Sequence, residues 1–150
     1  MNTEQIKIVE PSQRIRSHFD VYSVACLVVT KDKKFLFQHR DSHCVRYPNC
    51  LGPFGGRMEE NEKPFDALVR ELHEELGAKV DLDCVIELET IVKPYAKRQE
   101  LIFNYIWEDV RGTITGCYEG KAVGFSDRES VLNYPNVMED TKWLLDRYPS

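Results

Sequence analysis

Residues 55–78 read GGRMEENEKPFDALVRELHEELGA, and the interpretation of the chain begins with this stretch. Pro64 suits the first position of a helix, because the N–H that proline lacks would have no partner there. Three leucines then recur at a helical spacing: Leu68, Leu72 and Leu76. Gly77 supplies the stop, since glycine readily takes the left-handed conformation that ends helices. The pattern predicts an amphipathic helix whose leucines face a core.

Three glutamates share another face of this helix. Glu71, Glu74 and Glu75 stand at i, i+3 and i+4, and a helix places such residues side by side. Like charges at this spacing repel by about 0.2–0.5 kcal/mol per pair, so a cationic partner is expected. Mg²⁺ meets that need, because it prefers one or two carboxylates together with water and phosphate oxygens. A solvated acidic helix face is the simpler alternative.

The neighbours of the glutamates favour the metal site. Gly55 and Gly56 precede the helix, and glycine permits a close approach of the backbone to a ligand. Arg70 stands beside Glu71 and can orient a carboxylate through a bidentate contact. The stretch from Gly56 to Ala78 resembles the Nudix box, G-x5-E-x7-R-E-U-x-E-E-x-G-U, where U is apolar. All seven fixed residues are present, and the chance frequency of such a match at a given start is on the order of one in 10⁹.

The resemblance implies a hydrolase that splits a phosphoanhydride bond in a nucleoside triphosphate, or in a nucleoside diphosphate linked to another group. A bound cation lowers the pKa of water and a nearby carboxylate takes the proton. The implied cofactor is Mg²⁺, with Mn²⁺ as a substitute. The implied metal ligands are the Gly55 carbonyl, Glu71, Glu74, Glu75 and, from the downstream segment Tyr118-Glu119-Gly120, Glu119. The implied catalytic residues are Glu71, Glu74 and Arg70, with the general base left open. The residues implied to shape the motif are Gly56, Glu62 and Gly77.

Substrate contacts are predicted outside the helix. Arg40 ends the strand before a long loop and is a candidate phosphate ligand, with a surface arginine as the alternative. Phe54 is a candidate because an aromatic ring can stack on a base. It precedes the glycine pair where the family more often has aromatic-Pro-Gly-Gly, and this departure concerns how the loop shapes the base pocket. Asn136 is a candidate for reading a base edge. Tyr47 could stack on a base, although plain packing is the commoner role of such a ring.

The rest of the chain predicts a mixed α/β domain with a sheet between helices, an α/β/α arrangement. The ranges expected as strands are 21–29, 35–39, 80–92 and 101–110, the first two forming a hairpin. Residues 41–53 are expected to form a long functional loop. Ser126-Asp127-Arg128-Glu129 has the form of a capping box that opens a short helix, and 137–147 is expected to form a C-terminal amphipathic helix.

Length and composition suit one domain over residues 1–150, with 1–20 as an N-terminal extension or edge strand. The net charge of −5 disfavours a broad nucleic-acid surface, which needs clustered Lys and Arg. Five cysteines at irregular spacing, without a visible signal peptide or membrane span, predict a cytoplasmic protein with reduced thiols. The expected partner is a small nucleotide or another diphosphate compound, and a homodimer is compatible with the sequence.

Other functions are weighed against this one. An RNA-end hydrolase would keep the chemistry and need a basic groove, and a non-nucleotide diphosphate is a further substrate class. An isopentenyl diphosphate isomerase would share the fold but depart from the strict box. A non-catalytic nucleotide-binding module would usually lose box glutamates, and all of them are present. A zinc site formed by His39, His43, Cys44 and Cys50 matches no usual ligand spacing.

Overall fold

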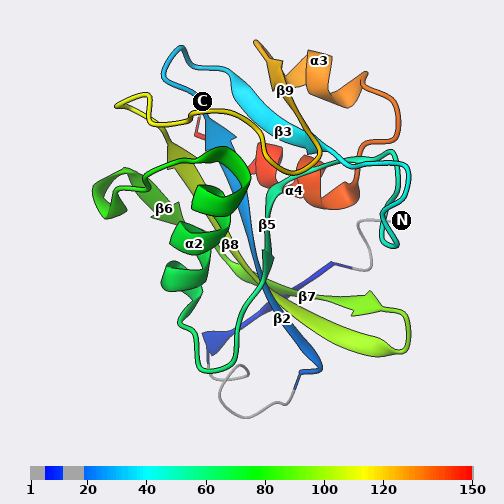
Figure 1. Ribbon diagram of the computed structural model, residues 1–150. Coiled ribbons are helices and arrows are strands. Elements are labelled where there is room, and N and C mark those ends of the chain that lie inside the picture. The colour runs from blue at the N-terminus through cyan, green and yellow to red at the C-terminus, as the bar shows by residue number, and fades with distance from the viewer. Residues whose placement is uncertain (1–5, 12–18, 150) are drawn as a thin grey trace.

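The computed structural model describes residues 6–11 and 19–149, and its frame is a mixed β-sheet with helices on both faces (Figure 1). The strands are β1 (Lys7–Val9), β2 (Val21–Val29), β3 (Phe35–His39), β4 (Leu51–Gly52), β5 (Phe54–Arg57), β6 (Val85–Glu87), β7 (Thr90–Tyr95), β8 (Arg98–Glu108) and β9 (Lys121–Phe125). The helices are α2 (Pro64–Leu76), α3 (Arg128–Leu132), α4 (Glu139–Asp146) and the short 3-10 helix η2 (Leu82–Cys84).

Strand β2 lies at the centre of the sheet. It runs parallel to β8, in a register from Val21 opposite Glu100 to Val29 opposite Glu108, and antiparallel to β3 and β5. The strand order is β1-β7-β8-β2-β3-β4, and β5, β6 and β9 pair outside this path with β2, β8 and β3. The continuous apolar sequence of β2 follows from this place, because a central strand is buried on both faces.

The two faces of the sheet carry separate cores. Side chains of β2 alternate between them, with Val24, Cys26 and Val28 facing α2 and the residues between them facing α4. The three leucines of α2 have no exposed surface. Figure 1 shows α2 on one side of the sheet and α4 on the other. The predicted sheet between helices is therefore confirmed, as is the helix that ends at Gly77, which has φ 65°.

One predicted strand is wrong. Residues 80–92 do not form a single strand, because the chain makes the η2 turn and then splits into β6 and β7, which pair with different parts of β8. The Asp81 side chain accepts a hydrogen bond from the backbone N–H of Asp83 (3.2 Å) and so stabilises that turn. A local aspartate turn overrides the β-forming composition of this stretch.

The terminal elements differ from the expectation in detail. Asp127, not Ser126, caps α3, because its carboxylate accepts the N–H of Ser130 (2.8 Å). The C-terminal helix begins two residues later than predicted, at Glu139. β1 pairs antiparallel with β7 and lies at one end of the strand order. Residues 1–5 and 12–18 of the N-terminal segment lie outside the described ones. Within the described residues, no helix combines the length and apolarity that a membrane span requires.

Candidate active site

The glycine pair allows β5 to lie directly against the glutamates of α2. Gly55 has φ 139°, and a Cβ there would lie 2.1 Å from the carbonyl oxygen of Val24 on the neighbouring strand β2. A Cβ on Gly56 would lie 2.6 Å from the carboxylate of Glu71. Contacts this short do not occur, so any other residue would push the strand away from the helix. The predicted structural role of Gly56 has this steric basis.

Glu75 is the buried centre of the site. Its side chain accepts the N–H of Gly55 at 2.9 Å and the side-chain amide of Gln38 at 3.5 Å, and the residue is 1 % exposed. Burial raises the pKa of Glu75 to about 9, and the negative charges of Glu119 and Glu71 act in the same direction, against the hydrogen bond from Gly55. The Glu75 carboxylate is thus buried at a place where its negative charge is unfavourable.

Arg70 ties the helix to the preceding loop. Its guanidinium donates two hydrogen bonds to Glu62, at 2.8 and 2.9 Å, and one to the carbonyl oxygen of Arg57 at 3.0 Å. The hydrogen bond from Arg70 lowers the pKa of Glu62 to about 2. A further N–H of Arg70 reaches Glu71 at 2.9 Å and Glu74 at 3.3 Å. The arginine therefore joins the predicted structural glutamate to two of the predicted ligands.

The three glutamates of α2 differ in exposure. Glu71 is buried, and burial raises its pKa although the hydrogen bond and charge of Arg70 oppose the shift. The Glu74 side chain is 55 % exposed and lies at the rim beside Arg70. Solvent exposure therefore increases along the predicted common face, from the buried Glu75 to the solvent-facing Glu74.

Glu119 reaches this site on the loop between β8 and β9. The backbone of that loop is hydrogen-bonded to the last turn of α2, where Tyr118 N–H donates to the Glu75 carbonyl at 2.8 Å. Gln38 donates its amide N–H to the Glu119 carbonyl at 2.8 Å. At the start of the loop, the buried Asp109 accepts the N–H groups of Thr113 and Ile114. These contacts bring Glu119 close enough to affect the pKa of Glu75.

The donor set suits a hard divalent cation. In the described part of the chain, no three acidic, histidine or cysteine side chains converge into a formed metal-binding group. The Glu71 carboxylate lies against Gly56, Glu75 accepts the N–H of Gly55, and the charges of Glu71 and Glu119 both act on Glu75. The pKa values of Glu71 and Glu75 are raised. A cation would offset that excess negative charge, and carboxylate oxygens are the ligands that Mg²⁺ prefers. Glu74 could join by leaving Arg70.

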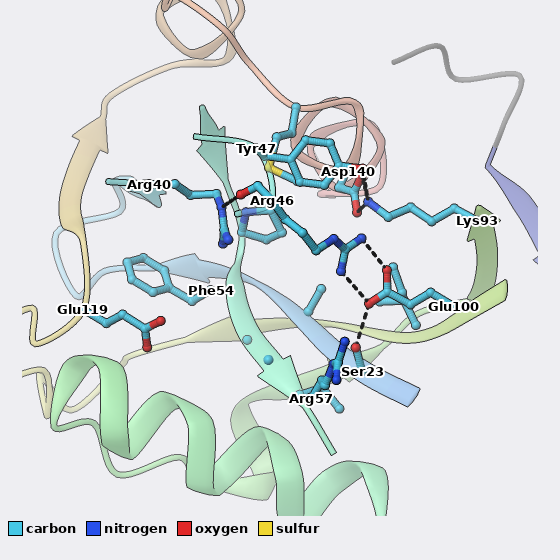
Figure 2. Close-up of a pocket in the computed structure, with 17 residues that line it drawn as sticks. Ser23, Arg40, Arg46, Tyr47, Phe54, Arg57, Lys93, Glu100, Glu119 and Asp140 are labelled. Carbon is cyan, nitrogen blue, oxygen red and sulfur yellow. Dashed lines mark hydrogen bonds and ion pairs between the residues drawn. The ribbon is translucent and has the colours of Figure 1, made fainter. Parts of the chain in front are cut away.

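A cleft of about 240 Å³ opens beside these glutamates (Figure 2). It lies between the strands β2, β5 and β8, the loop 41–50 and the first turn of α4, and Gly55, Gly56 and Glu119 belong to its wall. The charged side chains that line it include four cations, Arg40, Arg46, Arg57 and Lys93, and two further carboxylates, Glu100 and Asp140. The cleft therefore adjoins the acidic site, and its wall contains both cations and carboxylates.

Two buried ion pairs lie in the cleft wall. Arg46 donates to both carboxylate oxygens of Glu100, at 2.8 and 3.3 Å, and the hydroxyl of Ser23 donates to Glu100 at 2.8 Å. Burial alone would raise the pKa of Glu100, but the hydrogen bonds from Arg46 and Ser23 outweigh it and the pKa is lowered. Lys93 contacts both oxygens of Asp140 at 2.8 Å.

The chain is similar in sequence to known proteins of one family. A family model described as NUDIX domain matches residues 20–145. The chain belongs to this family. A Danio rerio protein named m7GpppN-mRNA hydrolase NUDT17 is 38 % identical over 73 residues, which are 49 % of this chain and 24 % of that protein. The match therefore spans about a quarter of the length of the curated relative.

Solved structures share the Nudix fold. The E. coli ORF135 protein superposes with a TM-score of 0.65 at 26 % identity, over 83 % of this chain and 86 % of that one. A MutT NUDIX hydrolase from Burkholderia pseudomallei gives a TM-score of 0.69 at 18 % identity, over 86 % of this chain and 98 % of that one. These similarities confirm the predicted family and fold class.

The predicted substrate residues of this Nudix chain differ in their position relative to the cleft. Arg40 lines the cleft, and its Nε–H donates to the carbonyl oxygen of Arg46 at 2.9 Å. Phe54 borders the cleft, but its ring has no exposed surface and packs in the core under α2, so stacking on a base is not supported. Asn136 is exposed in a turn with φ 57°, outside the cleft wall, and its carbonyl accepts the N–H of Leu51. Base reading by Asn136 is not supported either.

Sequence reasoning missed most of the cleft wall. Ser23, Arg46, Lys93, Glu100 and Asp140 lie on separate segments and form no motif. Charged residues inside otherwise apolar strands were the available signal: Lys93 follows Ile91 and Val92, and Glu100 precedes the run 101–103. Such residues are rarely buried without a partner.

Proposed function

We propose that this protein is a divalent-metal-dependent pyrophosphohydrolase. It cleaves a phosphoanhydride bond in a nucleoside triphosphate, or in a nucleoside diphosphate linked to another group. The observation that carries the proposal is the position of Glu75, buried next to Glu71 and Glu119 and directly beside a cation-lined cleft. Membership of the Nudix family supports the same reaction class.

The residues of the site have separate proposed roles in metal binding, positioning, proton transfer and phosphate binding. Mg²⁺, or Mn²⁺ in its place, would neutralise carboxylate and phosphate charge and lower the pKa of the attacking water. Glu71, Glu74, Glu75 and Glu119, with the Gly55 carbonyl, are the proposed ligands. The Gly55 N–H and Gln38 orient Glu75, and Arg70 positions Glu71. Glu71 or Glu74 takes the proton of the water as general base. Arg40 binds a substrate phosphate from the cleft wall.

A second substrate class has one observation in its favour. The 38 % identity to a protein named m7GpppN-mRNA hydrolase supports a capped RNA end as substrate. The bond cleaved would again be a phosphoanhydride, so the same acidic site could act on a small nucleotide or on a capped RNA end. The net charge of −5 favours the small nucleotide, because an RNA chain needs positive surface along its backbone.

The deciding experiment is a hydrolysis panel with Mg²⁺, with Mn²⁺ and with a chelator. It covers nucleoside triphosphates, nucleotide sugars, dinucleoside polyphosphates, ADP-ribose and a short capped RNA, and chromatography resolves the products. We expect metal-dependent release of a nucleotide from one small-molecule class, and release at least about 10³-fold slower from E75Q. The matched control is E108Q, which neutralises a half-buried glutamate at the end of β8. This glutamate is paired with Lys33 and does not line the cleft. Turnover of the capped RNA alone would favour the second class, and no turnover would contradict the proposal.

We also propose a cytoplasmic location and a single Nudix domain over residues 1–150. The described cysteines are all free thiols, which suits a reducing compartment. A homodimer through the N-terminal edge strand β1 is part of the proposal, and light scattering of the purified protein tests it.

A further inference from the structure

A buried amide follows the apolar start of strand β3. Gln38 is 4 % exposed, and its backbone is held on both edges of the strand, opposite Ala122 of β9 and Gly52 of β4. Side chains alternate between the two faces of a strand. Because Leu36 packs on the α2 side of the sheet and Phe37 on the α4 side, the side chain of Gln38 lies on the α2 side, with the glutamates. Burial of an amide is unfavourable unless it is hydrogen-bonded, so its partners indicate its role.

The two partners of this amide belong to the two segments that carry the proposed metal ligands. Nε2 of Gln38 lies 2.8 Å from the backbone carbonyl oxygen of Glu119 and 3.5 Å from Oε2 of Glu75. Both partners are acceptors, so the amide nitrogen with its two N–H groups faces them. In sequence they are 81 and 37 positions away from Gln38. One side chain therefore joins the loop between β8 and β9 to the last turn of α2.

Gly120 allows the amide to lie this close to the loop. It has φ 66°, and a Cβ there would lie 3.1 Å from both Cγ and Nε2 of Gln38 and 2.9 Å from the carbonyl oxygen of His39. The last of these distances is shorter than Cβ atoms tolerate, so an alanine would push the loop away from β3. The residue that follows Glu119 thus belongs to the same arrangement.

The loop also has anchors that do not depend on Gln38. The N–H of Tyr118 donates to the backbone carbonyl of Glu75, and Asp109 accepts two N–H groups at the start of the loop. These contacts should keep the loop against the sheet when the amide is removed. Gln38 adds a link from the backbone of Glu119 to the side chain of Glu75.

We propose that Gln38 is a positioning residue, which holds Glu119 and Glu75 so that both carboxylates are available to one divalent cation. The inference rests on the proposed function for the identity of these two ligands. The two carboxylates repel each other, so a group that holds them in place favours metal binding. The amide is uncharged and does so without neutralising them, as an arginine or lysine would. Loss of a hydrogen bond that orients a metal ligand costs about 10- to 100-fold in metal affinity.

Mn²⁺ binding tests this inference without turnover. Calorimetry and electron paramagnetic resonance compare the wild-type protein with Q38M, whose side chain has a similar length but no N–H donor. We expect Q38M to bind Mn²⁺ about tenfold or more weakly than wild type. The matched control is Q99M, the same substitution at an exposed glutamine of β8 that does not line the cleft, and it should bind Mn²⁺ as wild type does.

A double-variant cycle separates positioning from a packing defect. E119Q removes the charge of the ligand but keeps the backbone carbonyl to which Gln38 donates, so it should itself weaken Mn²⁺ binding. Because Gln38 acts through Glu119, adding Q38M to E119Q should weaken binding by at most about threefold more. A packing defect would give the same fold-change in both backgrounds, and that result would overturn the inference.

A second pair of variants keeps the test open if circular dichroism shows that Q38M does not fold. G120A crowds Gln38 from the side of the loop and should weaken Mn²⁺ binding about tenfold. G112A is its control, because Gly112 lies in the same loop with φ 67°. Among the described residues, a Cβ at Gly112 would meet only the flexible side chain of Lys31. Both variants place alanine in the left-handed region, and only G120A should affect the metal.

Wild-type Mn²⁺ affinity in both Q38M and G120A would overturn the inference and leave the proposed function in place. Failure of the proposed function gives a different result: Mn²⁺ binding would depend on Gln38 as expected, while the hydrolysis panel would show no turnover. Absence of Mn²⁺ binding in the wild-type protein would overturn the inference together with the proposed metal dependence.

Discussion

The acidic site contains the buried Glu75, and the opposite side of the cleft contains the buried Glu100; their pKa values are shifted in opposite directions. We call this opposite side the far end, and it is formed by Ser23, Arg46, Lys93, Glu100 and Asp140. At the acidic site, burial raises the pKa of Glu75 to about 9, with like charges adding to the effect. At the far end, Glu100 is also buried, yet the hydrogen bonds from Arg46 and Ser23 hold its pKa below the ordinary value. Among the described residues, no ion pair includes Glu75, whereas Glu100 is paired with Arg46.

This difference indicates how carboxylates in one small cleft can have two roles, metal binding at the acidic site and hydrogen bonding at the far end. Uncompensated carboxylates attract a metal ion and, through it, phosphates. Compensated ones keep their charge without attracting further ions and remain as hydrogen-bonding groups. Variants that remove charge should therefore have unlike consequences at the two ends, in function at the first and in stability at the second.

The largest effect is expected from E75Q. Its amide keeps the shape of the side chain but removes the charge that would bind the cation, so kcat should fall by about 10³-fold or more, equivalent to about 4 kcal/mol of activation free energy. Steady-state kinetics with Mg²⁺ measures the effect. The thermal midpoint without metal should stay close to wild type, and added Mg²⁺ should raise it in wild type but much less in E75Q. Wild-type kcat in E75Q would show that the acidic site has been wrongly placed.

The next largest effect is expected from K93M, which acts on stability. It leaves the buried carboxylate of Asp140 without its partner, and breaking such a pair costs about 3 kcal/mol or more. Urea unfolding measures the change. The double variant K93M/D140L should recover much of the loss, because it removes both charges. The control K33M, at an ion pair whose side chains are 66 % and 30 % exposed, should cost less than about 0.5 kcal/mol.

R70K is expected to have a smaller effect on catalysis. Lysine keeps the positive charge but cannot reproduce the two hydrogen bonds to Glu62 and the contact with Glu71. The carboxylates should be less well positioned, and kcat should fall by about 10- to 100-fold with little change in KM. R111K is the control, since the Arg111 side chain is 77 % exposed and pairs with Asp81 away from the site. An unchanged kcat in R70K would contradict this prediction, because it would show that catalysis needs only the positive charge of Arg70 and not its hydrogen bonds.

The smallest effect is expected from the titration of Glu100. In the unfolded chain its pKa has the ordinary value of 4.5, and in the folded protein it is lower. As the pH falls through 4.5 and toward the folded pKa, the unfolded state takes up the proton first, so this contribution to stability is present above that range and lost below it. The free energy of unfolding should therefore fall more steeply in wild type than in E100Q between about pH 6 and pH 3. Parallel pH profiles would contradict the assigned shift.

The acidic site was largely predictable because its determinants are close together in sequence. Glu71, Glu74 and Glu75 share a helix face by periodicity alone, and the helix limits Pro64 and Gly77 follow from the backbone chemistry of those two residues. Glu119 could be suggested only through the family resemblance. The structure explains its position by the hydrogen bonds between its loop and the end of α2.

The far end could not be predicted in the same way. Arg46 and Glu100 are 54 residues apart, and Lys93 and Asp140 are 47 residues apart. Each pair depends on the register of the sheet and on the path of the loop 41–50, which local patterns do not encode. The base contacts of Phe54 and Asn136 stay predictions. Only the packing shows that the Phe54 ring is buried at the cleft wall and that Asn136 is not part of that wall.

The parallel pairing of β2 with β8 also has a consequence for the order of folding. Residues joined in this register, such as Val21 and Glu100, are 79 positions apart, so the pairing closes a long stretch of chain and is expected to be slow. During synthesis, α2 with its three glutamates leaves the ribosome well before β8 and the loop that carries Glu119. The leucines of α2 pack against Tyr105 and Trp107 of β8 and gain that support only after the strands have paired. Tight metal binding should accordingly appear late in refolding and report that the sheet has closed.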